Sequence, residues 1–344
     1  MIALQIIGGL IGVILLYLII IIFLPVLKVP EQPMKNRKIN TIVPDCREDV
    51  SFIVEGSRIS AWFYKTDNST PSPCIIMSHG FGGTKDMALE QYALKFTKRG
   101  YSVLVYDYRY YGKSEGQPRQ LYCGIYQVED LKGAVKYVRA REDVDENKVV
   151  LWGTSAGANY GIIVAAEDFR IAAVIAQCGA FDHKEDNKLY YGEVGKMFFI
   201  KLLVHAQRDK GRSRFGLSPH KYPAYGKPGT IAMLNTAGSF EGIEKLAVGS
   251  ELFKNETCAR LAFMPHPADP LKAAPIVKCP VQVLVCKKDN LVSPKSHIRL
   301  VEILGEKADV IEYPIGHFDI YFGESFEKAT NEQLAFLDQK VGNN

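Results

Sequence analysis

The stretch that decides the fold is "KVVLWGTSAGANYG", residues 148–161, in which a short apolar run leads into one serine between two glycines. Its first five residues have the composition of a buried strand, and the residues after Gly157 are compatible with a helix. A sharp turn between them would hold Ser155 on a strained corner, because Gly153 and Gly157 lack side chains that would clash there. Ser155 is therefore the candidate nucleophile, and the alternative is a tight turn without chemistry.

Short apolar runs of the same kind recur along the chain. They are "CIIMSH" at 74–79, "SVLVYD" at 102–107, "IAAVIAQ" at 171–177, "VQVLVC" at 281–286 and "DVIEYP" at 309–314. Segments with helical spacing lie between several of them, as at residues 89–96. This alternation predicts a mostly parallel sheet, whose ligands bind at the carboxyl ends of the strands. Two alternating stretches at 50–56 and 59–65 predict an antiparallel pair at its beginning.

The N-terminal segment does not belong to this pattern. Residues 2–27 contain no charged side chain, and about 20 apolar residues suffice to cross a bilayer. A signal peptide would begin with Lys or Arg and end at a small-residue cleavage site, and neither is evident. We expect residues 1–28 to form a retained single-pass membrane anchor and residues 29–50 to form a linker.

Three features of the sequence bear on the side of the membrane. Basic residues follow the span, and the seven cysteines are scattered without a disulfide framework. Both features favour a cytosolic catalytic domain, the first through the positive-inside rule. The glycosylation sequons at Asn68 and Asn255 favour the opposite side. We expect a membrane-anchored protein with its catalytic domain in the cytosol.

The alternation of strands and helices is interrupted by a long irregular stretch. Residues 182–272 contain several segments that suggest short helices, between the predicted strands at 171–177 and 281–286. An insert at that place would lie over the strand ends, so we expect a lid that covers the site. The alternative is an elaboration that only packs. The expected core comprises residues 51–181 and 273–344.

Composition excludes some classes of function. The chain has 344 residues, with 42 Lys and Arg against 38 Asp and Glu, and a formal net charge of +4. This near balance, without a long basic run, gives no sign of nucleic-acid binding. Neither a metal nor an organic cofactor is expected, and the Cys and His positions lack metal-ligand spacing.

A serine nucleophile requires a histidine base, and in this architecture the expected order is serine, acid, histidine. Two histidines follow the predicted strand at 281–286. His297 falls within a predicted helix, where we expect a surface residue. His317 follows the predicted strand at 309–314, in the loop "IGHFDIY". His317 is therefore the candidate base.

The acid that orients the histidine should end the preceding strand. Asp289 does so in "VQVLVCKKDNLVSP", and its alternative role is to cap the next turn. Asp182, at the end of an earlier predicted strand, is the second choice. Asp319 lies too close to His317 in the sequence to be favoured.

Hydrogen-bond donors for an oxyanion are expected on either side of the serine. The backbone N–H of Ala156 follows the nucleophile directly. In "CIIMSHGFGGTKD" the N–H of Phe81 can point inward, because the glycines around it let the backbone fold tightly. We expect His79, in the same loop, to be a structural hydrogen-bonding residue.

Together these motifs resemble the α/β-hydrolase superfamily. The residues that carry the resemblance are "HGFGG", "DYRYYGKSEGQPRQ", "GTSAG", "LVCKKDNLVSP" and "GHFDIYFG", and it extends over about residues 51–341. "SEGQPRQ" and "GHFDIYFG" are similar to the branch that contains acetyl-xylan-esterase-like, dienelactone-hydrolase-like and fungal polyketide acyltransferase or thiohydrolase proteins. The resemblance implies an α/β-hydrolase fold, a Ser155, Asp289 and His317 triad, and an oxyanion hole at Phe81 and Ala156.

The expected function is a serine hydrolase that cleaves a small-molecule or lipid carboxylic ester or thioester through an acyl-enzyme. An acyltransferase would use the same triad with an alcohol or amine as acceptor, and the sequence does not separate the two. A peptidase is a weaker alternative, since no site for a peptide terminus is evident. A further alternative is a membrane-tethered binding protein that has lost the chemistry.

Overall fold

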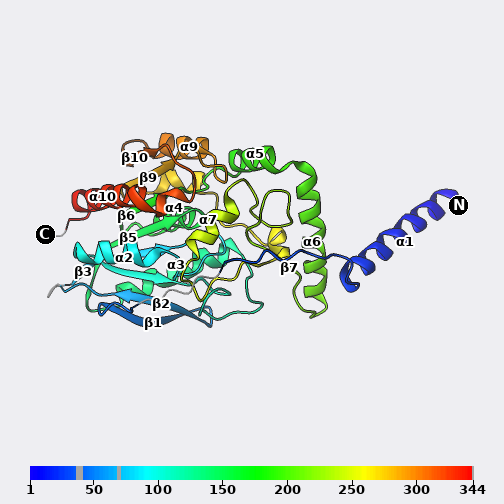
Figure 1. The fold of residues 1–344 in the computed structure, drawn as a ribbon, viewed down its shortest axis with the longest axis horizontal. Helices are drawn as coiled ribbons and strands as arrows, with labels where there is room; N and C mark the ends of the chain where they lie inside the picture. The colour runs from blue at the N-terminus through cyan, green and yellow to red at the C-terminus, as the bar shows by residue number, and fades with distance from the viewer. Residues whose placement is uncertain (36–41, 68–70, 343–344) are drawn as a thin grey trace.

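The computed structural model describes residues 1–35, 42–67 and 71–342. Within these residues, eight strands form one sheet in the order β1-β2-β4-β3-β5-β6-β9-β10 (Figure 1). β2 pairs antiparallel with β1 and β4, and the other neighbours are parallel, which confirms the mostly parallel sheet. The strands are β1 Arg47–Val54, β2 Ser57–Tyr64, β3 Ser72–Ser78, β4 Ser102–Tyr106, β5 Val144–Thr154, β6 Ile171–Gln177, β9 Val281–Cys286 and β10 Ala308–Tyr313, with β7 Lys221–Tyr222 and β8 Thr257–Cys258 as a separate pair.

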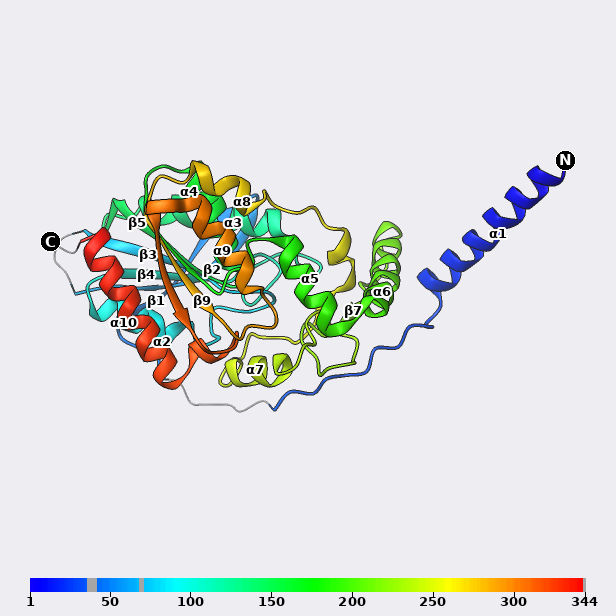
Figure 2. The ribbon, with the colours of Figure 1, turned by 90° about the horizontal axis from the view of Figure 1, so that it is seen from above.

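Helices cover both faces of the sheet (Figure 2). α3, α4 and α9 pack on one face, and α2 and α10 pack on the other. Successive residues of β5 point to opposite faces: Leu151 joins the first hydrophobic cluster, and Val150 and Trp152 join the second. Burial on both faces explains why the central strands read as continuous apolar runs. The helices are α1 Ile2–Phe23, α2 Leu89–Lys98, α3 Gly124–Arg139, α4 Ala156–Glu167, α5 His183–Val194, α6 Lys196–Arg214, α7 Ser239–Leu246, α8 Pro270–Ala273, α9 Pro294–Leu304 and α10 Gly323–Lys340.

The predicted antiparallel pair is confirmed as β1 and β2. β1 begins at Arg47, so the sheet starts inside the stretch that we expected to be linker. The ion pair between Arg47 and Glu90 of α2, at 2.6 Å, ties this strand to the body. Earlier in the expected linker, the Lys35 amide donates a hydrogen bond to Glu244 of α7 at 2.8 Å. Residues 29–35 therefore lie against the insert.

The insert is more regular than its sequence suggests. It contains α5, α7 and the 19-residue α6, where we expected several short helices. Side chains of this insert, including Tyr190, Tyr222 and Ile243, form a hydrophobic cluster with Phe81 and Met87 of the core. The insert is thus packed on the loop that follows β3.

α1 leads away from the body, as Figures 1 and 2 show. Its segment Gln5–Phe23 is 19 residues long with a mean hydropathy of 3.1, which is long and apolar enough to cross a bilayer. A signal sequence would meet the same criteria. The sequon at Asn255 has its side chain engaged: Oδ1 accepts from the Tyr225 amide and Nδ2 donates to the Tyr225 carbonyl, both at 2.8 Å. The sequon at Asn68 lies outside the described residues.

Close backbone contacts hold the corner between β5 and α4. A Cβ placed on Gly153 would lie 2.3 Å from the carbonyl oxygen of Gly157. A Cβ placed on Gly157 would lie 2.3 Å from the carbonyl oxygen of Ser78, at the end of β3. Only glycine allows the first turn of α4 to approach the strands this closely.

We predict that Gly157→Ala lowers the free energy of unfolding, by about 1–3 kcal/mol, because the new methyl group meets backbone that cannot move aside. Gly161→Ala in the same helix is the matched control. Its Cβ would lie 3.3 Å from Val174 Cγ1, a contact that a shift of a few tenths of an ångström relieves, so we expect a change within about 1 kcal/mol, which alanine's better helix propensity partly offsets. Denaturant unfolding of both variants measures the difference, and equal effects would contradict the role assigned to Gly157.

Candidate active site

Ser155 lies at the junction of β5 and α4 with φ 54° and ψ −123°. A side chain that adopts such a backbone conformation costs about 1–3 kcal/mol, which surrounding contacts must supply. The Ser155 amide donates a hydrogen bond to the Gln177 carbonyl at 2.9 Å, at the end of β6. A Cβ on Gly80 would lie 3.0 Å from the Ser155 Cβ, so the loop after β3 lies directly against the serine. The corner therefore has the strained geometry that the sequence predicts.

His317 and Asp289 are brought together from the ends of neighbouring strands. Both are buried, and His317 Nδ1 lies 2.5 Å from Asp289 Oδ2. The other carboxylate oxygen, Oδ1, accepts hydrogen bonds from the amides of Leu291 at 2.8 Å and Val292 at 2.9 Å. An Nδ1–H that donates to Asp289 leaves Nε2 as the acceptor of the ring. The carboxylate thus fixes both the tautomer and the orientation of His317.

Ser155 and His317 line one small cavity. Its volume is about 30 Å³, and Gly80 and Phe81 also contribute to its wall. In the described structure, the Ser155 hydroxyl and the His317 ring make no hydrogen bond to each other. Such bonds are often long in unliganded enzymes and tighten when substrate binds. The structure therefore brings these side chains to the same cavity, with Asp289 bonded to the histidine.

The other residues that line the cavity are largely apolar, and three of these residues come from the insert. Tyr225, Ile243 and Leu246 of the insert face Met87 and Phe318 of the core. The insert therefore contributes apolar side chains to the wall of the cavity that Ser155 lines.

The two amides expected to form the oxyanion hole border Ser155. Phe81 lies in the loop after β3, and Ala156 is the first residue of α4. Neither backbone N–H donates a hydrogen bond to another residue within the described chain. The Tyr225 hydroxyl donates to the Phe81 carbonyl at 2.7 Å, which fixes the peptide on one side.

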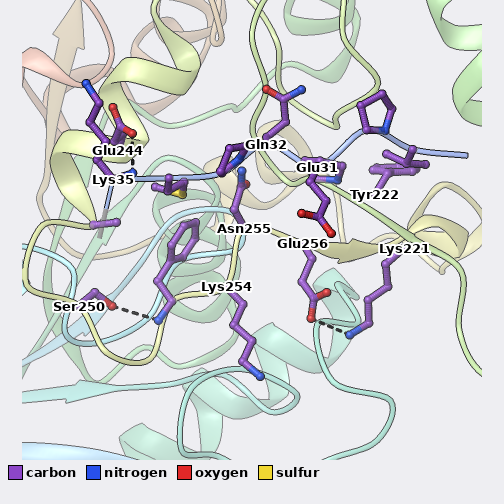
Figure 3. A pocket seen from close by; sticks show the side chains of 17 residues that line it. Glu31, Gln32, Lys35, Lys221, Tyr222, Glu244, Ser250, Lys254, Asn255 and Glu256 are labelled. Carbon is purple, nitrogen blue, oxygen red and sulfur yellow. Dashed lines mark hydrogen bonds and ion pairs between the residues drawn. The ribbon is translucent and has the colours of Figure 1, made fainter. Parts of the chain in front are cut away.

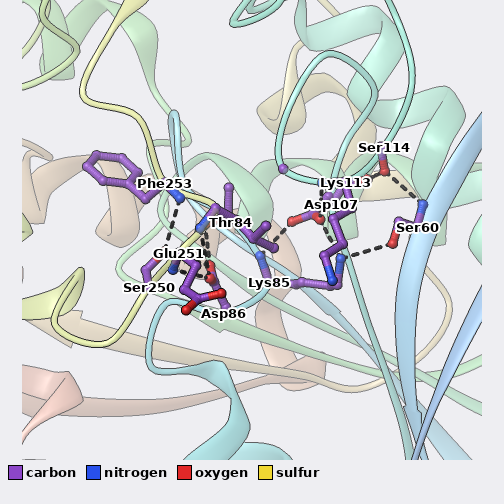
Figure 4. A network of polar contacts seen from close by, with 12 residues as sticks. Ser60, Thr84, Lys85, Asp86, Asp107, Lys113, Ser114, Ser250, Glu251 and Phe253 are labelled. Carbon is purple, nitrogen blue, oxygen red and sulfur yellow. Dashed lines mark hydrogen bonds and ion pairs between the residues drawn. The ribbon is translucent and has the colours of Figure 1, made fainter. Parts of the chain in front are cut away.

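A buried ion pair holds the loop after β3 to the core (Figure 4). The side chains of Lys85 and Asp107 are fully buried, with Nζ 2.5 Å from Oδ2. Asp107 also accepts hydrogen bonds from the amides of Lys85 at 2.8 Å and Lys113 at 3.0 Å. Lys85 Nζ donates in addition to the Ser60 hydroxyl at 3.0 Å. Both charges are thus satisfied, as charged groups inside a protein must be.

The next residue holds the same loop to the insert. Asp86 Oδ1 accepts a hydrogen bond from the Ser250 hydroxyl at 2.8 Å (Figure 4). Its Oδ2 accepts from the amides of Glu251 at 2.9 Å and Leu252 at 3.1 Å. The loop that carries Phe81 is therefore fastened to the core through Lys85 and to the insert through Asp86.

The other candidates from the sequence have structural partners. Asp182 caps α5, accepting from the Lys184 amide at 3.0 Å, and forms an ion pair with Arg299. Asp319 accepts from the Gly316 amide at 2.8 Å within its own loop. His79 is buried beside the cavity, and its Nδ1 lies 2.9 Å from the Gly80 carbonyl oxygen, as expected of a structural histidine. Burial lowers the pKa of His79.

The expectation that His297 is a surface residue is wrong. Its side chain is buried on the inner face of α9, in edge contact with the Phe181 ring at 5.3 Å. Loss of solvation lowers its pKa to about 4, so the imidazole is neutral at neutral pH. The apolar periodicity of α9 shows that one face is buried, but the side of the helix on which a histidine packs depends on its neighbours in space.

Figure 3 shows a larger cavity, of about 610 Å³. Residues 29–35 of the linker and residues of the insert form its walls, with the Lys221–Glu256 ion pair at 2.8 Å on one side. Ser155, Asp289 and His317 do not line it. Size alone therefore does not locate the candidate active site in this protein.

Sequence reasoning missed Asp186, which supports the loop of the candidate acid. Asp186 in α5 accepts hydrogen bonds from the Ser293 amide at 2.8 Å and the Ser296 hydroxyl at 3.3 Å, at the start of α9. The loop from Asp289 to Ser293 leads directly into this helix. Burial raises the pKa of Asp186 to about 7. No sequence signal indicated it, because its partners are about 107 residues away.

We predict that Asp186 makes the protein less stable as pH rises from about 4 to about 7. Its pKa of about 7 in the folded protein lies above the ordinary value of 3.8, so the folded state binds the proton more tightly. Stability gained at low pH is lost as the group ionises, by about 1.4 kcal/mol per pKa unit. Denaturant unfolding across this pH range should show that the free energy of unfolding falls less steeply for Asp186→Asn than for the wild type. The exposed Asp49→Asn is the control, and parallel curves for wild type and Asp186→Asn would contradict the prediction.

Comparison with known proteins agrees with the fold. Residues 73–324 match the family model described as the alpha/beta hydrolase fold. Quorum-quenching protein AidA of Acinetobacter baumannii is 34% identical over 299 residues, covering 87% of this chain and 97% of AidA. Polyketide transferase af380 of Aspergillus fumigatus is 27% identical, covering 85% and 97%. The crystal structure of the alpha/beta hydrolase GrgF from a Penicillium species has a TM-score of 0.72 at 26% identity, covering 87% of this chain and 99% of that one. The resemblance seen in the motifs is thereby confirmed: the chain is an enzyme of the α/β-hydrolase family.

Proposed function

We propose that Ser155, Asp289 and His317 are the catalytic triad of a serine hydrolase that cleaves a carboxylic ester or thioester. The observation that carries this proposal is the 2.5 Å contact between His317 Nδ1 and Asp289 Oδ2, beside a cavity that Ser155 and His317 both line. A histidine held in this tautomer presents Nε2 as a base, which a serine hydroxyl needs in order to attack at neutral pH.

In this mechanism His317 Nε2 takes the proton of the Ser155 hydroxyl as Oγ attacks the carbonyl carbon. The amides of Phe81 and Ala156 donate hydrogen bonds to the oxyanion, and Asp289 stabilises the charged imidazole. The bond to the alcohol or thiol then breaks, and His317 gives its proton to the leaving group. Water attacks the acyl-enzyme, its proton passes to His317, and the free acid leaves as Ser155 is reprotonated.

The insert, residues 182–272, acts in this proposal as a lid over the core of residues 51–181 and 273–344. Tyr225, Ile243 and Leu246 of the insert line the cavity beside Ser155. Their apolar surfaces suit the acyl part of a small-molecule or lipid substrate, since burial of apolar groups favours binding. The lid would open to admit the substrate and exclude water when it closes.

We further propose that residues 1–28 anchor the enzyme in a membrane, with residues 29–50 as linker and the catalytic domain in the cytosol. The length and apolar character of Gln5–Phe23 support the anchor. The basic residues that follow the span support the orientation. An enzyme tethered in this way meets substrates that partition into the bilayer at high local concentration.

We predict that Ser155→Ala and His317→Ala each lower kcat/KM on a short-chain p-nitrophenyl ester at least about a thousandfold. The exposed Ser51→Ala in β1 is the matched control and should change it little. A fluorophosphonate probe should label the wild type and the control but not Ser155→Ala. Near-full activity in either triad variant would show that the assignment is wrong, and an unlabelled, folded wild type would favour a binding protein without chemistry.

Acyl transfer is the second candidate, because af380, which matches this chain over 97% of its own length, is named a polyketide transferase. An apolar cavity favours transfer if it keeps water from the acyl-enzyme long enough for an alcohol or amine to attack.

We predict that the wild type releases free acid as its main product from an acyl-thioester, even with glycerol or a short-chain amine present. Mass spectrometry of the products measures the partition between acid and acylated acceptor. Acylated acceptor that forms in excess of acid, and disappears in Ser155→Ala, would establish the transferase instead.

A further inference from the structure

α6 has an exposed apolar face. Met197, Ile200 and Leu203 are 65%, 53% and 46% exposed. The opposite face of the helix is buried in the insert through Phe198 and Leu202. An exposed stripe of large apolar side chains on a long helix indicates a surface that another apolar phase covers.

The same face contacts α1 in the second half of α6. Gln207 and Gly211 lie seven and eleven residues after Ile200, which places all three on one side of the helix. The Tyr17 hydroxyl lies 3.5 Å from Gln207 Oε1, and a Cβ on Gly211 would lie 2.5 Å from the Ile22 side chain. Figure 1 shows α6 between the body and α1. The exposed apolar residues therefore continue the surface on which the apolar helix rests.

Two arginines of α6 bind the carboxyl end of α1. Arg208 donates hydrogen bonds to the carbonyls of Ile21 and, at 2.6 Å, Leu24. Arg212 donates to the carbonyl of Ile22 at 3.1 Å. The last carbonyls of a helix lack partners within it and carry partial negative charge. The guanidinium groups supply these carbonyls with hydrogen-bond donors and with positive charge.

The length of α1 sets the depth of this junction. Nineteen residues, Gln5–Phe23, rise by about 28 Å, and the hydrocarbon core of a bilayer is about 30 Å thick. The whole segment is needed to cross, so its end lies at the boundary between acyl chains and head groups. The rings of Phe23 and Phe215, with centroids 5.2 Å apart, join the end of α1 to the end of α6. The second half of α6 contacts the last two turns of α1 and therefore lies near that depth.

The charge of α6 indicates which lipids it would meet. Lys196, Lys201, Lys210 and Arg214 are exposed around the apolar face. Asp209 is the sole acidic residue in the sequence of α6, and its side chain is buried. Exposed apolar residues flanked by lysine and arginine are typical of helices that lie in the interface of anionic membranes.

From these observations we propose that α6 lies flat in the boundary of the bilayer that α1 crosses. Met197, Ile200 and Leu203 contact acyl chains, and the neighbouring lysines contact anionic phosphate head groups. This second contact, besides α1, would fix the insert at the membrane surface. The inference rests on the proposed anchor and is independent of the proposed catalytic residues.

The test uses the full chain in vesicles of phosphatidylcholine and phosphatidylglycerol that contain lipids brominated near the head group. We expect the tryptophan introduced by Ile200→Trp to lose about half of its fluorescence, because an interfacial helix buries its apolar face about 5–10 Å deep. Ile53→Trp in β1, where the native side chain is 67% exposed, is the control and should lose none. The unsubstituted chain, with Trp62 and Trp152 in the sheet, gives the background.

A second set of variants tests the choice of lipid. In the Ile200→Trp chain, Lys196→Glu with Lys201→Glu should reduce the quenching at least about twofold in vesicles with phosphatidylglycerol. Lys65→Glu with Lys287→Glu, two exposed lysines of the body, is the matched control and should leave it unchanged. Quenching that does not respond to the α6 lysines, or to phosphatidylglycerol, would overturn the assignment to anionic lipid.

Flotation of the vesicles separates this inference from the anchor. A chain that floats with the vesicles while Ile200→Trp is quenched no more than Ile53→Trp overturns the placement of α6 and leaves the anchor standing. A chain that does not float overturns both. The introduced tryptophan could instead be shielded from water to a degree that depends on the ratio of protein to lipid, without quenching by brominated lipid. That result would show that a second copy of the chain covers the face, and it too would overturn the proposal.

Discussion

Backbone contact at the corner between β5 and α4 is the constraint on which the rest of the structure depends. Ser155 has a positive φ that a side chain adopts at a cost, and Gly153 and Gly157 allow the strand, the helix and the end of β3 to meet around it. Ser155 stands at the carboxyl ends of the strands, where the loops that carry Asp289 and His317 also emerge.

The loop after β3 connects the two parts of the protein. Its Lys85–Asp107 ion pair is buried in the core, whereas Asp86 holds Ser250 of the insert and the Phe81 carbonyl is bound by Tyr225. The proposed oxyanion amide is therefore positioned partly by the segment that is proposed to open. If the proposed lid opens by moving the segments that carry Ser250 and Tyr225, these contacts break, and substrate entry would then be coupled to the geometry of the proposed oxyanion hole. This coupling is a route by which substrate shape could affect the rate of the chemical step.

The parts of the site that could be predicted lie where a sequence pattern has a fixed geometric meaning. An apolar run followed by a polar residue marks the end of a buried strand, and this placed Asp289 and His317 close together. His297 and Asp186 had no such pattern. The first is buried because α9 packs on Phe181, and the second matters because α5 crosses the start of α9. Such contacts join distant segments, and no pattern in either segment indicates that the two will meet.

The sequence by itself determined the alternation of strands and helices, the strained serine corner and an apolar segment long enough to span a bilayer, because each depends on the residues of one local stretch. Only the tertiary structure decided that the insert lines the cavity with Tyr225 and Ile243, that a buried ion pair supports the Phe81 loop, and that α6 meets the end of α1. The physical reason is that packing between distant segments depends on shape and burial in three dimensions, and local patterns restrict these only to one face of each helix or strand.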